Sequence, residues 1–264
     1  MENGFRITVS LVNYNGGGAV VKTARCVLEQ TKAHPVELFV FDNGSSDGSD
    51  RALEAIPGVR LVRTGKNIGF GAAHNRILLE ETGRYLAVIN PDISFDTDVL
   101  SRLCEVLEEH PEIGMITPRI FGADGQEQFL PKRTPTKRYV FLGRLSRIFP
   151  GFRKYRDEYT RAGEPMEGLC EIENCTGCFF VIRSELFREI GGFDEGFFMY
   201  FEDSDLSRRV GQRAKIVFDG DCRVTHLWKR ESAGSLRYLF IHLKSCFRYF
   251  KKWRNHHENS DHRL

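Results

Sequence analysis

The stretch Phe193–Leu206, FDEGFFMYFEDSDL, places five carboxylates around an almost unbroken aromatic run. Carboxylates are rarely buried beside apolar surface unless they are paired, bound to a metal or used in a reaction. The pattern therefore indicates either an ordinary helix start or a site that holds its acids for chemistry. The acids are Asp194, Glu195, Glu202, Asp203 and Asp205.

Polar residues also follow three runs that are typical of buried β-strands, ITVSLVN, VELFVF and YLAVI. They form the clusters Asn13–Asn15, Asp42–Asn43 and Asn90–Asp92. A helical pattern follows each cluster, and strands that alternate with helices form a parallel sheet with crossover helices. Ligands of such sheets bind beyond the carboxyl ends of the strands. We therefore expect the three clusters to meet at one edge, which suits a nucleotide-like ligand.

The alternation predicts a Rossmann-like α/β domain with a mostly parallel sheet flanked by helices. Strands are expected at 7–13, 36–41, 59–62, 85–89, 113–116 and 175–183, and helices at 19–30, 49–56, 71–81, 97–110 and 185–190. A hairpin turn is expected at 122–126. The dinucleotide fingerprint is absent, because GFGAAH ends in His74 and the triple glycine at 16–18 has Val21 at its last position. Hydride chemistry is therefore disfavoured.

Composition and cysteine spacing favour a globular protein of the reducing cytoplasm. The 264 residues are 41% hydrophobic, enough for a packed core, and the net charge of +2 recruits neither nucleic acid nor membrane by itself. The N-terminus shows no signal-peptide pattern, and no apolar run approaches the roughly 20 residues that a membrane-spanning helix needs. We therefore expect no segment that directs the chain into or across a membrane. The seven cysteines are irregularly spaced, which favours free thiols, and the Cys175–Cys178 pair is interpreted as packing rather than as a metal or redox site.

Two segments are strongly basic. Nine Lys and Arg residues and no acid occur in 132–156, interleaved with aromatic residues, which indicates either a solvated face or a surface for anions or membranes. The tail 234–255 has a helical apolar repeat with six basic residues and no acid. It is expected either to pack its apolar side on the domain or to lie in the headgroup region of a membrane. The apolar repeat is Leu236, Leu239, Phe240, Leu243, Phe247, Phe250 and Trp253.

Six motifs in order, VSLVNYN, VFDNGSSDGS, NIGFGAAHN, INPDIS, CTGCFFVIRSELFREIGGFDEGFFMYFEDSDLSRRV and VTHLW, resemble the family-2 glycosyltransferases with the GT-A fold, and among them the bacterial rhamnosyltransferases. The resemblance covers roughly residues 5–235. It implies a GT-A domain at 1–235 followed by a basic amphipathic helix and tail at 236–264. It also implies inverting transfer of a sugar from a nucleoside diphosphate donor, with Mg²⁺ or Mn²⁺ on the diphosphate.

The resemblance also assigns residues. Asp203 is the expected base that deprotonates the acceptor, near a helix N-terminus, with Glu202 beside it. The aromatic residues of 197–201 are expected to wall the site. In the metal motif, Asn90 stands where a second acid often occurs, which leaves metal affinity in question. The other expected donor-binding residues are Asn13, Asn15, Asp42 on the nucleobase, Asn43, Asn67, Gly69 and Asp92, and the expected metal ligands are Asp92 and His226.

The resulting hypothesis is a transferase at the inner face of the cytoplasmic membrane that moves L-rhamnose from dTDP-L-rhamnose to a lipid-linked saccharide of a bacterial surface polysaccharide. Asp42 has a structural alternative, because a carboxylate after a strand often forms an Asx-turn. A UDP-sugar donor, a nucleotidyltransferase and a non-catalytic membrane-binding module are the alternatives for function. The nucleotidyltransferase is disfavoured because GGGAVVK is too short for its glycine-rich signature.

Overall fold

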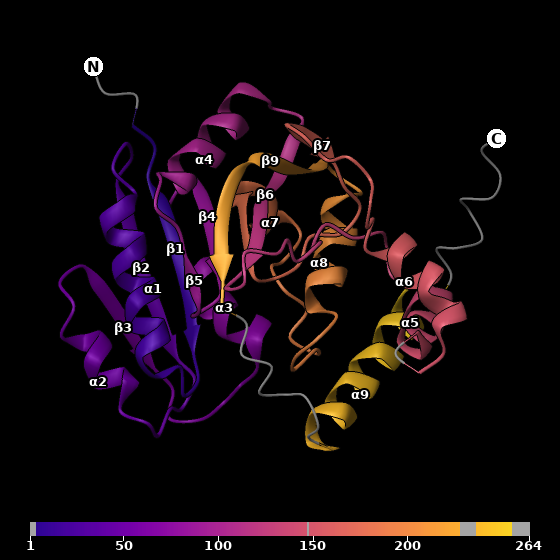
Figure 1. Cartoon of the computed structure of the whole chain (residues 1–264). Coiled ribbons are helices and arrows are strands. Elements are labelled where there is room, and N and C mark those ends of the chain that lie inside the picture. The colour runs from indigo at the N-terminus through magenta and orange to yellow at the C-terminus, as the bar shows by residue number, and fades with distance from the viewer. Residues whose placement is uncertain (1–3, 147, 228–235, 255–264) are drawn as a thin grey trace.

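Figure 1 shows the computed structural model of the chain, which describes residues 4–146, 148–227 and 236–254. One nine-stranded sheet has the order β3-β2-β1-β4-β8-β6-β9-β5, and β7 pairs with β9. The strands are β1 (Ile7–Asn13), β2 (Val36–Asp42), β3 (Val59–Arg63), β4 (Tyr85–Ile89), β5 (Ile93–Ser94), β6 (Ile113–Gly122), β7 (Leu169–Glu171), β8 (Phe179–Arg183) and β9 (Lys215–His226). The helices are α1 (Gly17–Gln30), α2 (Ser49–Glu54), α3 (Phe70–Leu78), α4 (Val99–Glu109), α5 (Lys137–Leu145), the 3₁₀-helix η1 (Pro150–Phe152), α6 (Arg153–Tyr159), α7 (Ser184–Glu189), α8 (Glu202–Val210) and α9 (Leu236–Lys252).

The amino-terminal half of the sheet is parallel, as the alternation of strands and helices predicts. β1 pairs in parallel with β2 and β4, and β2 with β3. The register sets Asn13 opposite Asp42 at the carboxyl ends of β1 and β2. Beyond β4 the sheet is mixed, because β8 pairs antiparallel with β4 and β6, while β6 and β9 are parallel.

The central strands are buried between two apolar layers. Along β1, Ile7, Val9 and Leu11 pack with α1, α2 and α4, whereas Val12 belongs to the layer of α3, α7 and α8. Successive side chains of a strand point to opposite faces, so β4 (YLAVI), which contributes to both layers, is apolar at nearly every position. These two layers fix the strand ends, and with them the polar clusters that follow β1, β2 and β4.

The helices and strands expected from the sequence are present, and most lie within a few residues of their predicted bounds. The strand predicted at 113–116 is longer than expected, since β6 continues to Gly122. The strand predicted at 175–183 is wrong at its start, since β8 begins at Phe179. The backbone N–H groups of Cys175 and Gly177 donate to Ser207 Oγ and Asp203 Oδ2 of α8 rather than to a neighbouring strand. Residues 175–178 therefore form a loop that contacts α8. The predicted hairpin turn is present, with the Gly122 N–H donating to the Gln126 carbonyl.

The C-terminal helix α9 packs on the aromatic stretch that precedes α8 (Figure 1). The buried side of α9 is formed by Cys246, Tyr249 and Trp253, which contact Phe197 and Phe201. The apolar repeat, which was expected either to pack on the domain or to lie at a membrane, is largely exposed, and of its members Phe250 and Trp253 take part in this contact. Among the described helices, none is long and apolar enough to cross a bilayer. The exposed members of the repeat are Leu236, Leu239, Phe240, Leu243 and Phe247.

Candidate active site

A pocket of about 400 Å³ opens at the carboxyl edge of the parallel strands. Seven residues singled out in the sequence line it, so the predicted convergence of the strand-end clusters is observed. They are Asn15, Asn43, Asn67, Gly69, Asn90, Asp92 and His226. A larger and more open hollow of about 930 Å³ lies at the amino ends of the strands, near Phe5 and Arg84. We place the candidate site in the smaller pocket, because the polar clusters that end β1, β2 and β4 meet there.

Asp42 and Asn13 do not line this pocket. The buried carboxylate of Asp42 accepts hydrogen bonds from Asn13 Nδ2 at 2.9 Å and from the backbone N–H groups of Gly44 at 3.3 Å and Ser45 at 3.1 Å. Asn13 Oδ1 accepts from the Gly16 N–H at 3.1 Å. Both side chains therefore hold the turns that shape the pocket, which is the Asx-turn alternative for Asp42.

Asn43 is the residue of this cluster that reaches the pocket. Its Nδ2 donates to Asn67 Oδ1 and to the Gly69 carbonyl, both at 3.1 Å, and its Oδ1 accepts from the Ile68 N–H at 2.8 Å. Gly69 has a φ of +97°, and a Cβ there would lie 2.5 Å from the carbonyl oxygen of Phe198. A side chain at Gly69 is therefore excluded both by its backbone conformation and by space.

Asp92 and His226 lie side by side at the wall of the pocket. His226 Nε2 lies 3.1 Å from Asp92 Oδ1, and His226 Nδ1 lies 3.0 Å from Gln128 Oε1. When the Nδ1–H of His226 donates to Gln128, the Nε2 atom of His226 carries a lone pair that points toward the Asp92 carboxylate. Nε2 and the carboxylate are then both acceptors, and two acceptors at this distance require a proton or a metal ion between them. Asn90 Nδ2 is 3.5 Å from His226 Nε2.

This pair fits a cation that is shared with a substrate. Within the described ranges, no group of three or more His, Cys, Asp or Glu side chains is arranged to hold a metal ion. Mg²⁺ and similar ions are often held by one or two protein ligands together with substrate phosphate oxygens. Asp92 and His226 supply that number of ligands, at the pocket wall rather than in an enclosed cage.

Three of the five carboxylates of the stretch Phe193–Leu206 lie in the first turn of α8, which confirms the predicted place of Asp203 near a helix N-terminus. Asp203 Oδ1 accepts from the Ser204 N–H at 2.7 Å, and Oδ2 accepts from the Gly177 N–H at 3.2 Å, which fixes its orientation. A Cβ at Gly177 would lie 3.6 Å from Asp203 Cβ and 3.1 Å from the ring of Phe70, a residue of the pocket wall. Asp203 is not among the residues that line the pocket, but it contacts Gly177, which also adjoins Phe70 of the pocket wall.

Glu202 is buried next to Asp203. Burial, followed by the charge of Asp203, raises the pKa of Glu202 well above its usual range, which favours the neutral acid. Its Oε2 has no hydrogen-bond partner among the described residues. The two adjacent acids therefore have different surroundings. The carboxylate of Asp203 is oriented by backbone N–H groups, whereas the carboxyl group of Glu202 is buried.

The aromatic wall expected around the site is only partly present. Phe198 lines the pocket, but Phe197 and Phe201 are buried against α9. Tyr200 and Phe201 have φ values of +71° and +66°, which are unusual for side chains of this size and cost of order 1–3 kcal/mol each. This turn directs Phe201 away from the pocket and starts α8 at Glu202, so most of the aromatic run serves packing.

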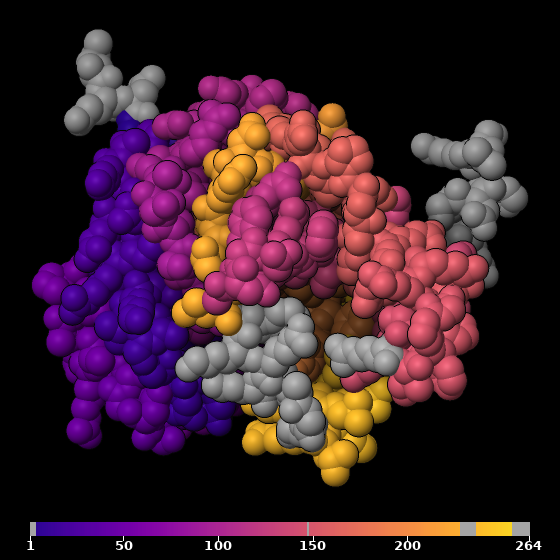
Figure 2. Space-filling model, viewed as in Figure 1, coloured from indigo at the N-terminus to yellow at the C-terminus, as the bar shows by residue number. Residues whose placement is uncertain are grey.

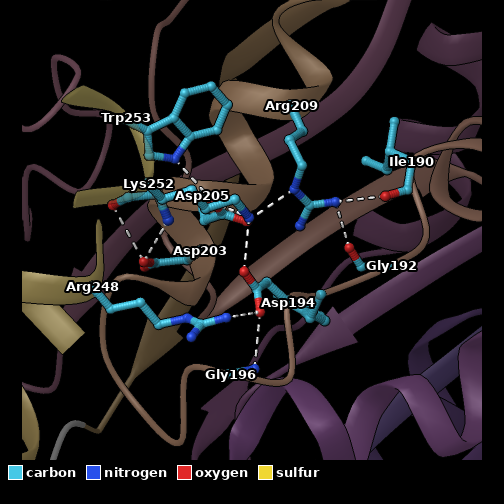
Figure 3. Close-up of polar contacts among 12 residues, drawn as sticks. Ile190, Gly192, Asp194, Gly196, Asp203, Asp205, Arg209, Arg248, Lys252 and Trp253 are labelled. Carbon is cyan, nitrogen blue, oxygen red and sulfur yellow. Dashed lines mark hydrogen bonds and ion pairs between the residues drawn. The ribbon is translucent and has the colours of Figure 1, made fainter. Parts of the chain in front are cut away.

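Two other acids of the stretch hold α9 in place (Figure 3). The fully buried Asp205 accepts from Trp253 Nε1 at 2.9 Å and pairs with Lys252 at 2.7 Å and Arg209 at 2.9 Å. Asp194 pairs with Lys252 and Arg248, both at 2.8 Å. Although partial burial opposes ionisation, these cations and the Gly196 N–H lower the pKa of Asp194 to about 2.

No partners were predicted from the sequence for Asp194 and Asp205, although the basic C-terminal tail offered candidates. The basic tail 234–255 contains no acid, so acids elsewhere in the chain are its available partners. The same contacts place the first turns of α9 at the pocket, which Arg237, Tyr238 and Ile241 line. None of these three residues was expected in the site.

The fold is the GT-A glycosyltransferase fold. A crystal structure of GalNAc-T7 with UDP, GalNAc and Mn²⁺ matches 95% of this chain and 48% of that chain, with a TM-score of 0.69 and 18% identity. The mannosyltransferase PcManGT of Pyrobaculum calidifontis, in complex with GDP-Man and Mn²⁺, matches 93% of this chain and 65% of that one, with a TM-score of 0.60 and 17% identity. The chain thus spans about half to two thirds of these structures.

The chain belongs to glycosyl transferase family 2, whose family model matches residues 8–191. It is similar to the N-acetylglucosaminyl-diphospho-decaprenol L-rhamnosyltransferase of Mycobacterium tuberculosis, with 30% identity over 232 residues that cover 81% of this chain and 74% of the relative. The rhamnosyltransferase WbbL of Escherichia coli is 32% identical over 85 residues, which are 31% of this chain and 32% of the relative.

Proposed function

We propose that this glycosyltransferase inverts the anomeric carbon of its donor sugar, with Asp203 as the base. The observation that carries the proposal is the oriented carboxylate of Asp203 beside a pocket whose other wall holds Asp92 and His226. The acceptor hydroxyl gives its proton to Asp203 as its oxygen bonds to the anomeric carbon. The bond from that carbon to the diphosphate breaks on the opposite side, and its electron pair goes to the diphosphate oxygen. Glu202, in its neutral form, would donate a hydrogen bond to the acceptor.

Asp92 and His226 would hold a divalent cation, Mg²⁺ or Mn²⁺, on the donor. When bound, the cation neutralises charge on the diphosphate leaving group. Asn43, Asn67 and the backbone at Gly69 would bind the nucleoside portion, since they form the polar wall next to Asn15. Asn13 and Asp42 act on this site through the turns that they hold.

The donor that we propose is dTDP-L-rhamnose, and the acceptor is a lipid-linked saccharide of a bacterial surface polysaccharide. Similarity supports this choice, because the relative from Mycobacterium tuberculosis is named for an L-rhamnosyl group and for a diphospho-decaprenol-linked sugar. No described pocket residue selects a 6-deoxy sugar by itself, so a UDP-sugar donor is the competing assignment.

Donor hydrolysis by the pure protein tests the proposal without knowledge of the acceptor. We expect the protein to hydrolyse dTDP-L-rhamnose faster than UDP-sugars when Mg²⁺ or Mn²⁺ is present, measured as release of the nucleoside diphosphate. Preference for a UDP-sugar would assign the other donor. In the same assay, Asp92→Ala should remove the cation-dependent part of turnover, while Asp96→Ala, at an exposed site, should behave as the parent. Equal cation dependence in all three proteins would contradict the Asp92 assignment.

We also propose that the protein docks on the inner face of the cytoplasmic membrane. Nine of the fourteen exposed large hydrophobic side chains among the described residues lie on α9 and the α5–η1 region. These segments are neighbours, since Arg144 Nη1 lies 3.3 Å from His242 Nδ1, and Figure 2 shows their atoms side by side. We call this surface the docking face. Its apolar members are Phe141, Leu145, Ile148, Phe149, Leu236, Leu239, Phe240, Leu243 and Phe247.

The charges of the docking face match an anionic lipid surface. Some basic side chains of these segments form ion pairs within the protein. Arg138 pairs with Glu158, and both Arg248 and Lys252 pair with Asp194. Four lysines of α5, α6 and α9 form no ion pair with an acid among the described residues, and each basic residue near an anionic membrane contributes about 1 kcal/mol. These residues are Lys137, Lys154, Lys244 and Lys251.

We expect the protein to sediment with liposomes that contain anionic lipid at low salt and to be released as salt screens the attraction. Deletion of α9 is a poor test, because it also removes Lys252 and Trp253 from Asp205. Phe240→Ser and Phe247→Ser are better, since these side chains are 78% and 73% exposed. The double variant should lose most binding, while Leu169→Ser on β7 should keep it. Parent-like binding by the double variant would contradict docking through this face.

A further inference from the structure

The donor pocket has little positive charge of its own. Its described lining contains one carboxylate, Asp92, and His226, while Asn15, Asn43 and Asn90 are neutral. A nucleoside diphosphate brings at least two negative charges into this pocket. A second acid at position 90 would strengthen a cation site, but this chain has Asn90 there. A cation held by Asp92 and His226 alone would be bound weakly, and it would compensate the negative charge of the diphosphate only in part. A further cationic group at the pocket would therefore favour the bound donor.

The first turn of α9 supplies such a group. Arg237 lines the pocket, and it is the single Lys or Arg of the described lining. No ion pair or hydrogen bond joins its guanidinium to another residue in the described part of the chain. Most other arginines near the site are engaged, as Arg209 is by Asp205 and by the carbonyls of Ile190 and Gly192.

The position of Arg237 is set by a firmly held helix. Four turns further along α9, Lys252 and Trp253 contact the fully buried Asp205 (Figure 3). Near the middle of the helix, Ser245 Oγ donates to the carbonyl oxygen of Met199 at 2.8 Å, and Met199 is itself part of the pocket wall. Arg237 therefore extends from a helix whose backbone is fixed at two points.

We infer that Arg237 is a catalytic residue that binds the diphosphate of the donor, an inference that rests on the proposed function. Its guanidinium would donate hydrogen bonds to the phosphate oxygens in the ground state. These bonds strengthen as the anomeric carbon–oxygen bond breaks, because the electron pair of that bond passes to the diphosphate oxygen while the acceptor proton passes to Asp203. Helix α9 is then a part of the active site as well as of the docking face.

Nucleotide binding tests the inference with the full chain. For Arg237→Ala we expect the dissociation constants of dTDP and UDP to rise at least about tenfold, because charge-assisted hydrogen bonds to the diphosphate are lost. Binding of thymidine and uridine should not change, since the nucleoside lies on the asparagine wall. Donor turnover should fall by a factor on the order of 10². Arg237→Lys should give intermediate values, because the charge remains while the planar fork is lost.

The matched control is Arg76→Ala, which removes an exposed arginine on α3 that does not line the pocket, and it should bind and turn over as the parent. Unchanged dTDP and UDP constants with parent-like turnover in Arg237→Ala would overturn the inference and leave the proposed function intact. An equal loss of nucleoside and diphosphate binding would overturn it too, because it indicates a disturbed pocket. A parent that binds neither dTDP nor UDP would overturn both proposals.

Discussion

Asp203→Asn is expected to lower the rate of sugar transfer by a factor on the order of 10²–10⁴, the usual contribution of a general base. Asparagine has nearly the same shape, and its single amide oxygen can keep the hydrogen bond from the Ser204 N–H, while the longer bond from the Gly177 N–H is lost. The start of α8 should therefore keep most of its geometry. It does not take up the proton of the acceptor hydroxyl. The loss should therefore appear in kcat, while the dissociation constant of the donor nucleotide stays nearly unchanged.

Steady-state transfer kinetics and nucleotide titration on the same preparations provide the measurement. Asp96→Asn is the matched control, because Asp96 is an exposed acid away from the pocket. Near-normal transfer by Asp203→Asn would remove Asp203 from the mechanism. A large loss of nucleotide affinity in that variant would instead assign Asp203 to donor binding.

The strand-end half of the site follows from the sequence because topology fixes it. Parallel strands covered on both faces must end at one edge, so Asn15, Asn43 and Asp92 had to converge once β1, β2 and β4 were recognised. Local hydrogen bonding is less predictable. Asp42 and Asn43 are neighbours in sequence, yet one holds a turn with Asn13 and the other faces the pocket.

The packing of α9 could be predicted only in part, because the sequence left two alternatives for its apolar repeat, packing on the domain or lying at a membrane surface. The apolar repeat with Phe240 and Phe247 gives the strongest periodic signal in the tail, but the packed side is chosen by specific contacts. Trp253 and Lys252 reach Asp205, which is 48 and 47 residues away in the chain, and no periodic pattern reports contacts of that kind. Helix α9 therefore packs through the side with Tyr249 and Trp253 and leaves the more apolar side with Phe240 and Phe247 exposed. The docking face depends on this exposed side.

Asp205→Ala is expected to destabilise the protein by about 3–5 kcal/mol, the usual cost of removing one partner from a buried ion pair. Asp205 is 0% exposed and pairs with Arg209 and Lys252 while accepting from the indole N–H of Trp253. The loss would be a large part of the 5–15 kcal/mol that stabilises a typical protein. Denaturant unfolding of parent and variant, followed by tryptophan fluorescence and circular dichroism, provides the measurement.

Two companion variants separate the buried contacts from ordinary surface charge. Asp205→Asn should cost less than Asp205→Ala, because an amide oxygen still accepts from Trp253 while Lys252 retains Asp194. Asp194→Ala should cost the least, since its partners Arg248 and Lys252 are partly exposed to solvent. Parent-like unfolding of Asp205→Ala would show that the buried contacts do not stabilise the fold. Destabilised α9 also carries Arg237 away from the pocket, so nucleotide affinity should fall in the same order as stability across the three variants.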